Sequence, residues 1–395
     1  MTSLLKVAVF TDNDFEKVNG VTTVLSAMLT RVPDDLSVRV YTASRLVADH
    51  PDYLALSSWG VGIPYYGEMR MYWPPYRRLI HRLRADGVQL LHLTTPGPLG
   101  IAAVLAARHL GLPLVGSFHT DLAQYTTLLS GRPALGAFMR YYMNWLYRPC
   151  RRVLTPSTAT RDLLIGGGMP AAQLAIWGRG VDTDFFTPDR RSAWLRTGWR
   201  ADDTRPVVMY VGRVSREKGV HVLPVLHDAL RRLGHTHRLV IIGDGPLRAE
   251  IARHCPDAVC PGALGKEALA DAYASADVFV FPSTTDTAGN VVLEAQASGL
   301  PVVVSDVGGP QEQMRAGETG YVCGDTPEAW TRVVARLLDD TVARRAMGRA
   351  ARRFATSRTW DEALMPLFDT YRAIGAAAVP RAQPAGGPVA ARQVA

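Results

Sequence analysis

The sequence contains few cysteines and no long hydrophobic segment. Only 4 of its 395 residues are cysteines, and no two of them form a C-x-x-C pair. So few cysteines exclude a disulfide framework, disfavour a structural zinc site and fit a reducing cytoplasm. The longest apolar stretch, residues 99–115, is interrupted by Arg108 and His109, and no segment reaches the roughly 20 apolar residues that span a bilayer. We therefore expect that the chain does not span a membrane. This observation does not bear on peripheral attachment to a membrane surface. The cysteines are Cys150, Cys255, Cys260 and Cys323.

The sequence also shows no sign of a signal peptide, a dinucleotide-binding fingerprint or an RNA-binding pattern. The N-terminal apolar run breaks at Lys6 and has no small-residue cleavage site, so we expect a first strand there rather than a signal peptide. No G-x-G-x-x-G fingerprint is present, which argues against a dinucleotide enzyme. The net charge of +8 suits anionic ligands, but no basic–aromatic pattern typical of RNA binding occurs. We therefore expect no nucleic-acid partner.

The chain instead alternates between short apolar runs and longer amphipathic stretches. Apolar runs without polar alternation predict strands that are buried on both faces, and helices between them predict an α/β fold with parallel sheets. The predicted strands are Val7–Phe10, Val38–Tyr41, Leu90–Leu93, Leu114–Ser117, Val153–Pro156, Val207–Val211, Arg238–Ile242, Val278–Phe281 and Pro301–Val304. The predicted helices include Gly20–Thr30, Pro75–Ala85, Leu99–Leu110, Val220–Leu233, Lys266–Ala274 and Val291–Ala297.

This alternation stops once, near the middle of the chain. Residues 177–191 read WGRGVDTDFFTPDRR and are rich in Gly, Asp and Pro, which predicts a linker. We therefore expect two doubly wound domains of similar size, at residues 1–185 and 190–358. A further helix is predicted at residues 360–374. Residues 375–395 contain few bulky apolar side chains and much Ala, Pro and Gly, which predicts a disordered tail.

Doubly wound sheets bind ligands beyond the carboxyl ends of their strands, so residues that follow strands are candidates for a site. Gly20 precedes the first helix and would let backbone amides approach a phosphate, although an ordinary turn explains this motif better by itself. His119, in the motif SFHTD, follows a strand and can exchange a proton near neutral pH. The alternative is a histidine that satisfies a backbone carbonyl, and the position favours a functional role.

The second half holds stronger signals. In VGRVSREKGV, the glycine Gly212 and the cations Arg213 and Lys218 follow a buried strand, a pattern typical of a diphosphate site rather than a solvated basic loop. Asp286 and Glu294 are separated by seven residues around a helix start. Carboxylates accept hydrogen bonds from sugar and ribose hydroxyls, and a helix N-terminus supports a diphosphate. The alternative is that Asp286 caps the helix and Glu294 lies on its surface. That alternative does not explain why an acidic residue stands inside the largely apolar VVLEAQA.

Together the Asn-Gly loop, SFHTD, VGRVSREKGV, GDGP and the acidic pair before ASGLPVV resemble retaining glycosyltransferases of family 4, bacterial mannosyl- and glucosyltransferases among them. The resemblance extends to about Ile374. It implies the GT-B fold, in which two Rossmann-like domains face a central cleft, the donor lies mainly on the second domain, and the last helix returns to the first. It implies transfer of a hexose, with retention, from a GDP-mannose or UDP-glucose type donor to a lipid or glycan hydroxyl. The alternatives are a sugar-nucleotide epimerase of the same fold and a nucleotide-sugar-binding protein without turnover.

The same resemblance implies a role for each candidate residue. The two basic residues would neutralise the donor's diphosphate, and amides at Gly20 would approach it from the opposite domain. Glu294 would bind the ribose, Asp286 the transferred sugar, and His119 would lie beside the reacting centre. The family usually has Glu where Asp286 stands, so a shorter side chain meets the sugar here. The catalytic candidates are His119, Arg213, Lys218 and Asp286, and the donor-binding candidates are Gly20, Gly212, Arg213, Lys218, Asp286, Asn290 and Glu294.

Two further motifs concern a metal and a membrane. Asp182 and Asp184 form a D-x-D motif, but it lies in the linker rather than after a nucleotide-binding strand, so we expect no metal and no cofactor. Residues 69–85, MRMYWPPYRRLIHRLRA, contain five arginines and no acidic residue. With Arg77, Arg78 and Arg82 on a predicted helix, this segment is typical of a helix on an anionic membrane. The alternative is a helix whose apolar face packs on the first sheet. The resemblance favours the membrane, so we expect a cytoplasmic enzyme on the inner face of the plasma membrane.

Overall fold

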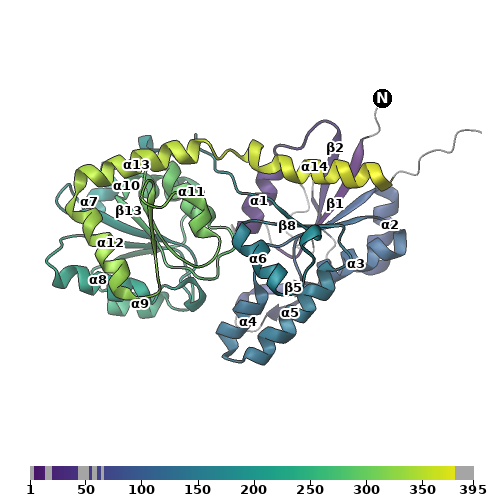
Figure 1. Ribbon diagram of the computed structural model, residues 1–395, viewed down its shortest axis with the longest axis horizontal. Coiled ribbons are helices and arrows are strands. Elements are labelled where there is room, and N and C mark those ends of the chain that lie inside the picture. The colour runs from purple at the N-terminus through teal and green to yellow at the C-terminus, as the bar shows by residue number, and fades with distance from the viewer. Residues whose placement is uncertain (1–3, 14–19, 43–52, 56–59, 64–65, 379–395) are drawn as a thin grey trace, which may run out of the picture.

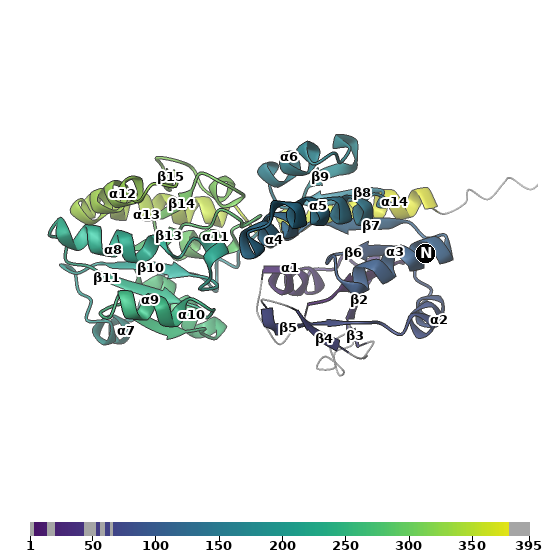
Figure 2. The same ribbon diagram turned by 90° about the horizontal axis from the view of Figure 1, so that it is seen from below.

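The computed structural model describes residues 4–13, 20–42, 53–55, 60–63 and 66–378. Two parallel sheets lie side by side, each between layers of helices (Figure 1). The loops at their junction come from both halves of the chain, and α4 (Leu122–Ser130) lies there (Figure 2). The predicted α/β class with doubly wound sheets is confirmed.

The first sheet has seven strands. In spatial order they are β3 (Tyr53–Ala55), β2 (Leu36–Thr42), β1 (Leu5–Thr11), β6 (Leu90–Leu93), β7 (Leu114–Ser117), β8 (Arg152–Thr155) and β9 (Leu174–Ile176), and an antiparallel pair, β4 (Gly60–Ile63) and β5 (Tyr66–Tyr72), lies apart from them. The helices of this half are α1 (Gly20–Leu29), α2 (Tyr76–Asp86), α3 (Pro98–Leu110), α4, α5 (Pro133–Tyr147) and α6 (Thr158–Gly166).

The second sheet has six strands. In spatial order they are β12 (Val259–Gly262), β11 (Arg238–Ile242), β10 (Val207–Val211), β13 (Val278–Phe281), β14 (Val302–Ser305) and β15 (Gly320–Cys323). Its helices are α7 (Ala193–Gly198), α8 (Val222–Arg232), α9 (Arg248–His254), α10 (Lys266–Ser275), α11 (Asn290–Ala297), α12 (Pro327–Asp339) and α13 (Thr341–Thr356), and the 3-10 turns named below are η4 (Arg216–Lys218) and η5 (Pro310–Gln313).

Every strand predicted from the sequence is present, and every one is an interior strand of its sheet. The N-terminal segment forms β1, as expected. The strands at the four sheet edges, β3, β9, β12 and β15, were not predicted. Edge strands are short and partly exposed, so they do not produce the continuous apolar runs of strands that are buried on both faces.

The last helix, α14 (Trp360–Ala378), lies on the first sheet although it follows the second in sequence (Figure 1). Successive residues of β1 point to opposite faces. Val7 and Val9 pack with α1 and with Leu367 of α14, while Ala8 and Phe10 pack with α3 and α5. The helix continues through Ala378 rather than ending at Ile374. Residues 375–378 of the predicted tail are therefore helical, and residues 379–395 lie outside the described part of the chain.

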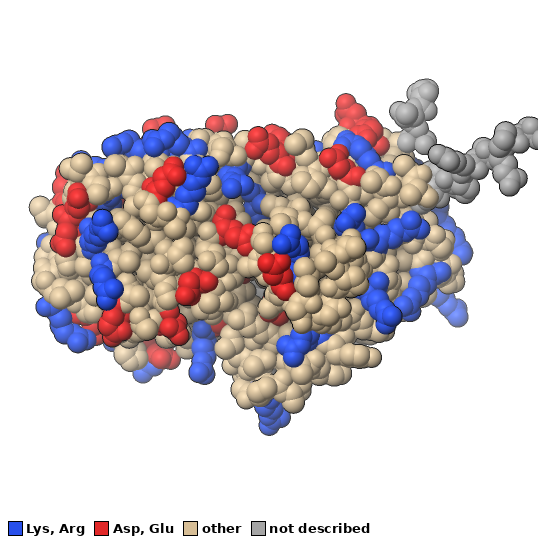
Figure 3. Space-filling view, in the orientation of Figure 1, with Lys and Arg blue, Asp and Glu red and all other residues tan. Residues whose placement is uncertain are grey.

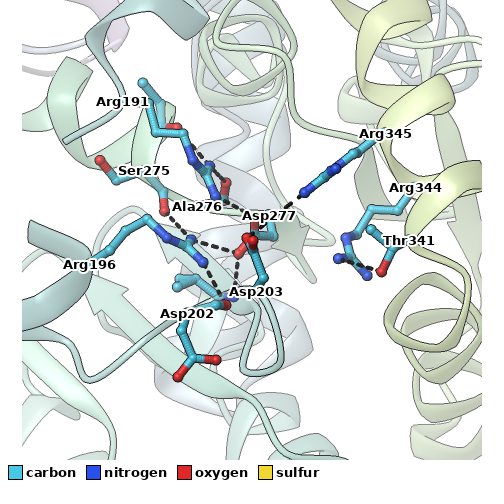
Figure 4. Close-up of polar contacts among 12 residues, drawn as sticks. Arg191, Arg196, Asp202, Asp203, Ser275, Ala276, Asp277, Thr341, Arg344 and Arg345 are labelled. Atoms are coloured by element: carbon cyan, nitrogen blue, oxygen red, sulfur yellow. Dashed lines mark hydrogen bonds and ion pairs between the residues drawn. The ribbon is translucent and has the colours of Figure 1, made fainter. Parts of the chain in front are cut away.

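A buried cluster of charges lies at the amino end of the second sheet (Figure 4). Asp277, immediately before β13, accepts hydrogen bonds from Arg191 Nη2 at 2.9 Å, Arg196 Nη1 at 2.8 Å and the backbone N–H of Val207 at 2.8 Å. Burial would raise the pKa of Asp277, but these partners hold it below its ordinary value. The cluster attaches α7 and the segment before it to the sheet.

Candidate functional site

The two halves meet where loops follow β7, β8 and β13. Thr287 Oγ1 donates to the carbonyl of His119 at 2.6 Å, and Ser157 Oγ donates to the carbonyl of Thr287 at 2.9 Å. Gln124 Nε2, on α4, donates to the carbonyl of Thr284 at 3.4 Å. The carboxyl ends of strands from both sheets therefore face one another, which is where doubly wound folds bind ligands.

Two helix N-termini face each other across this junction. α1 begins at Gly20 and α11 begins at Asn290, and a β-carbon at Gly20 would lie 3.7 Å from Asn290 Nδ2. The buried Oδ1 of Asn290 has no hydrogen-bond partner within the described part of the chain. Each helix N-terminus presents backbone N–H groups and the positive end of a dipole. Such an arrangement attracts an anion from both sides.

Lys218 and Asp286 form a partly buried ion pair at the same junction. Lys218 Nζ lies 2.7 Å from Asp286 Oδ2. The other carboxylate oxygen of Asp286 accepts hydrogen bonds from the N–H groups of Ala288 and Gly289, at 3.1 and 2.7 Å. Burial alone would raise the pKa of Asp286, but Lys218 and these N–H groups hold it below its ordinary value. The aspartate is therefore ionised beside a cation, although the sequence assigned the two residues separate roles.

The backbone around Gly219 explains how Lys218 reaches this position. The sequence predicts a helix start near Gly219, but Gly219 instead ends η4 with a φ of +69°, and α8 begins only at Val222. A β-carbon at Gly219 would lie 2.2 Å from the carbonyl oxygen of Pro282. Glycine therefore lets η4 contact the end of β13 directly, which brings Lys218 against Asp286.

Arg213 follows Gly212 at the end of β10. Gly212 has a φ of +151°, and a β-carbon at Gly243, in the GDGP turn, would lie 1.9 Å from the Gly212 carbonyl oxygen. The two turns therefore pack backbone against backbone. Arg213 Nε lies 3.8 Å from Glu217 Oε1, and the Glu217 side chain is 1% exposed. Glu217, which the sequence analysis did not single out, therefore lies within ion-pair distance of Arg213.

Glu294 lies inside α11 with one hydrogen bond from a buried tyrosine. Tyr273 Oη donates to Glu294 Oε2 at 3.1 Å. Burial raises the pKa of Glu294 to about 7, against the opposing effects of Tyr273 and Lys266. The carboxyl group therefore changes charge near neutral pH, and its remaining acceptor capacity is available to hydroxyl groups.

Both ring nitrogens of His119 are engaged by side chains. Nε2 lies 2.8 Å from Ser117 Oγ, and Nδ1 lies 3.2 Å from Arg179 Nη2. Burial, Arg179 and His92 together lower the pKa of His119 well below its ordinary value, so the ring is neutral at physiological pH. The sequence alternative, a ring bonded to a backbone carbonyl, is wrong for the described residues. Arg179 was not singled out; the only signal was an arginine between glycines just after a strand.

Comparison with known proteins identifies the family. Residues 18–185 match the family described as Glycosyltransferase Family 4, and residues 205–340 match the one described as Glycosyl transferases group 1. A GDP-mannose-dependent alpha-mannosyltransferase of Mycolicibacterium smegmatis is 38% identical over 312 residues, which cover 76% of this chain and 77% of that protein. The chain belongs to glycosyltransferase family 4.

Similar proteins and structures support this membership and the fold. Sulfoquinovosyl transferase SQD2 of Arabidopsis thaliana is 33% identical over 322 residues, 76% of this chain and 59% of that protein. Sucrose-phosphate synthase of Thermosynechococcus elongatus superimposes with a TM-score of 0.76 at 19% identity, over 94% of this chain and 100% of that one. WaaG, a glycosyltransferase involved in lipopolysaccharide biosynthesis, superimposes with a TM-score of 0.67 at 18% identity. The match covers 93% of this chain and 99% of that one. The predicted GT-B fold is confirmed.

This family 4 enzyme transfers a hexose from a nucleotide sugar. The predicted hexosyltransferase activity is thus confirmed, and the two alternatives, an epimerase and a binding protein without turnover, are set aside. The roles that the resemblance implies for His119, Arg213, Lys218, Asp286 and Glu294 stay predictions. The structure brings His119, Lys218 and Asp286 to the junction between the two sheets. The ion pair of Arg213 and the hydrogen bond of Glu294 that are described above lie within the second half.

The three arginines of α2 lie elsewhere in the family 4 enzyme. Arg77, Arg78 and Arg82 are exposed, while the apolar face of α2 is buried against the first sheet, so the packing alternative accounts for that face. Arg82 also pairs with Asp86 at 3.0 Å. The arginines line a pocket of about 450 Å³ together with His81 and Leu54. None of the described helices is long and apolar enough to cross a membrane.

The D-x-D motif of the family 4 enzyme has a local structural role. Asp182 Oδ1 accepts a hydrogen bond from the N–H of Phe185 at 3.0 Å, which closes a turn between the two halves. Over the described ranges, no three His, Cys, Asp or Glu side chains gather in a way that could hold a metal ion.

Proposed function

We propose that this enzyme transfers mannose from GDP-mannose to a hydroxyl of a lipid or glycan, with retention of the anomeric configuration. The donor assignment draws on relatives that are named GDP-mannose-dependent alpha-mannosyltransferases and are 38%, 37% and 34% identical to this chain. The observation that carries the proposal is the Lys218–Asp286 ion pair, at a junction where the N-termini of α1 and α11 face each other.

These features match the charge that develops during transfer. As the bond between the sugar C1 and the diphosphate oxygen breaks, negative charge grows on the leaving diphosphate. Lys218, Arg213 and the amides near Gly20 would stabilise it, and preorganised cations and N–H groups are well suited to that task. Asp286 would orient the sugar hydroxyls, and Glu294 would bind the ribose. Asn290, with its unpartnered buried Oδ1, would complete the donor site.

Retention is supported by the roles of the titratable groups in the described site, where Glu294 is assigned to the ribose. The proton of the acceptor hydroxyl must leave as its oxygen bonds to C1. His119 has both nitrogens engaged, and Asp286 is ion-paired with Lys218. The oxygen of the leaving diphosphate, on the face where the bond broke, would therefore take the proton, so the acceptor enters from that face.

Two measurements test this proposal. Thermal denaturation with GDP-mannose, UDP-glucose and ADP-glucose should show the largest rise in Tm with GDP-mannose, because ligand binding stabilises the folded state by mass action. Proton NMR of the product formed from the α-linked donor should show an α-linkage. A larger shift with UDP-glucose would reassign the donor, and a β-linked product would contradict retention.

We further propose that the enzyme works at an anionic membrane surface. The exposed arginines of α2 support this, and so does the outer face of α5. Phe138 and Tyr141 are 63% and 70% exposed, and Trp145 follows on the same helix face. Residues 122–161 contain no acidic residue. In Figure 3 the lobe formed by α4 and α5 shows blue and tan atoms but no red. Aromatic side chains among arginines suit the headgroup region of anionic lipids.

Sedimentation with vesicles tests this surface. Binding should increase with the phosphatidylglycerol fraction and weaken in high salt, at about 1 kcal/mol for each basic residue near the surface. Replacing Arg77, Arg78 and Arg82 with Ser should reduce it. A matched control replaces three exposed arginines of the second half, Arg232, Arg332 and Arg349, with Ser. Equal sedimentation of both variants, or none with any vesicle, would contradict the membrane assignment while leaving donor specificity untouched.

A further inference from the structure

Arg179 is a buried cation that contacts its own segment and one residue, His119, of the loop after β7. It is 5% exposed and lies in the segment that follows β9. Its Nη1 donates to the carbonyls of Trp177 and Gly178 at 3.0 and 3.1 Å, and its Nη2 donates to His119 Nδ1 at 3.2 Å. The guanidinium carbon lies 5.1 Å from the centre of the Trp177 indole ring. These contacts fix the guanidinium in one orientation.

The tautomer of His119 follows from what an arginine can do. A guanidinium group only donates hydrogen bonds, so His119 Nδ1 must accept and carries no proton. The proton of the neutral ring is then on Nε2, which donates to Ser117 Oγ at 2.8 Å. The groups that disfavour a second proton on this ring are Arg179 and, beyond Ser117, His92, in addition to burial.

The hydrogen-bonded chain continues into the first half of the protein. Ser117 Oγ lies 3.0 Å from His92 Nε2, and His92 Nδ1 lies 2.5 Å from Tyr371 Oη of α14. Because Ser117 accepts the proton of His119, its own hydroxyl proton is directed at His92 Nε2. His92 then donates from Nδ1 to Tyr371. When each group donates a hydrogen bond to the next in this order, every polar group from Arg179 to Tyr371 of α14 has a partner.

We propose that Arg179 is a positioning residue that fixes His119 as the Nε2–H tautomer and holds its ring beside the site of hexose transfer. This rests on the proposed function, which places His119 beside the reacting centre. Arg179 sets the tautomer through Nδ1. The indole of Trp177, 5.7 Å from the His119 ring at an interplanar angle of 77°, sets the ring plane for both residues.

NMR of the full-length protein with ¹⁵N-labelled histidine tests the tautomer directly. The His119 signals are identified by their absence in His119→Gln. In the wild type, Nδ1 should have the shift of an unprotonated nitrogen and Nε2 that of a protonated one, unchanged between about pH 5.5 and 8.5. In Arg179→Met, the signals should change toward a tautomer mixture and begin to respond to pH. A wild-type proton on Nδ1, or unchanged signals in the variant, would overturn the proposal.

A matched control separates positioning from folding. Arg344 is also 5% exposed; its Nη1 donates to the carbonyls of Leu337 and Leu338, and its Nη2 to Thr341 Oγ1. Arg344→Met should leave the His119 signals unchanged. Arg179→Met should lower kcat by about 10²-fold, with a smaller change in KM, as expected for a displaced active-site group.

If Arg179→Met does not fold, the NMR signals of His119 in Ser117→Ala test the proposal instead. Arg179 still occupies Nδ1 in that variant, so the tautomer should persist, and a switch of tautomer would overturn the proposal. The NMR measurement uses neither donor nor acceptor. It therefore stands or falls separately from the proposed mannosyl transfer.

Discussion

Two aspartates flank β13, and they show how the position on a sheet separates structure from function. Asp277 lies before the strand and Asp286 after it, and partners hold the pKa of each below its ordinary value despite burial. The partners of Asp277 are arginines that also donate to carbonyls of the same half, such as Arg196 Nη1 to Ser275 at 2.9 Å (Figure 4). The cation beside Asp286 is one lysine at the junction with the other half.

The comparison shows that an ion pair does not by itself indicate whether an aspartate has a structural or a functional role. At the amino end of the strand, the partners of Asp277 come from its own half and connect α7 to the sheet. At the carboxyl end, the pair faces the loops of the first sheet, where a ligand binds in this fold class. Four measurements can break or sharpen this comparison.

The largest expected effect is on stability. Asp277→Ala removes a carboxylate that is only 13% exposed, and so leaves the buried Arg196 and the 40% exposed Arg191 without it. Breaking such a pair from one side typically costs about 3–5 kcal/mol. Urea denaturation should show this loss in the free energy of unfolding, while kcat of the folded fraction stays near the wild-type value. Unchanged stability combined with lost activity would reverse the roles assigned to the two aspartates.

The next effect is on turnover. Lys218→Ala and Arg213→Ala should each lower kcat by about 10²–10³-fold, because in the proposed mechanism each residue places a preorganised charge next to the leaving diphosphate. Circular dichroism should show a folded protein in both cases. The double variant Lys218→Ala with Asp286→Asn removes both charges of the pair and should regain stability without regaining activity. Near-normal kcat in both single variants would refute the diphosphate assignment.

A smaller effect concerns pH and Glu294. Burial raises the pKa of this carboxyl from its ordinary 4.5 to about 7. The folded free enzyme therefore binds more protons than the unfolded chain in that interval, and the contribution of Glu294 to stability falls as the pH rises from about 4.5 to 7. If the carboxylate binds the ribose, GDP should bind about tenfold more weakly near pH 6 than near pH 8.

Calorimetry of GDP binding across that pH range measures this dependence. Glu294→Gln should weaken binding and leave only the pH dependence of the terminal phosphate of GDP, whose second pKa is about 6. The exposed Glu267, on neighbouring α10, provides the control, and Glu267→Gln should retain the wild-type profile. A wild-type profile in Glu294→Gln would mean that another group titrates.

The smallest expected effect is that of removing metal ions. Lys218, Arg213 and the helix N-termini supply positive charge at the junction, so we expect initial rates to be the same with and without excess EDTA. Loss of activity in EDTA that Mg²⁺ or Mn²⁺ restores would show that the site needs a metal. It would also weaken the comparison between Asp277 and Asp286, because the cation beside Asp286 would then not supply all the positive charge that the site needs.

The surface that we propose binds a membrane could be predicted only in part from the sequence. The basic face of α2 can be read from the arginine spacing, and the exposed arginines agree with it. The aromatic face of α5 was not predicted, since Phe138, Tyr141 and Trp145 look like core residues in a sequence. Only the packing of the other face of α5 against the first sheet shows that these rings point outward.

The sequence by itself determined the interior of the fold and the chemical types at the site. Interior strands are buried on both faces and need uninterrupted apolar runs, so β10 and β13 are visible in the sequence, while the edge strands β12 and β15 are not. Strand ends are visible too, so Lys218 and Asp286 could be named in advance. Only the tertiary structure decided that they pair and that Arg179 reaches His119. These contacts join residues far apart in the chain, and local sequence patterns carry information only about neighbours.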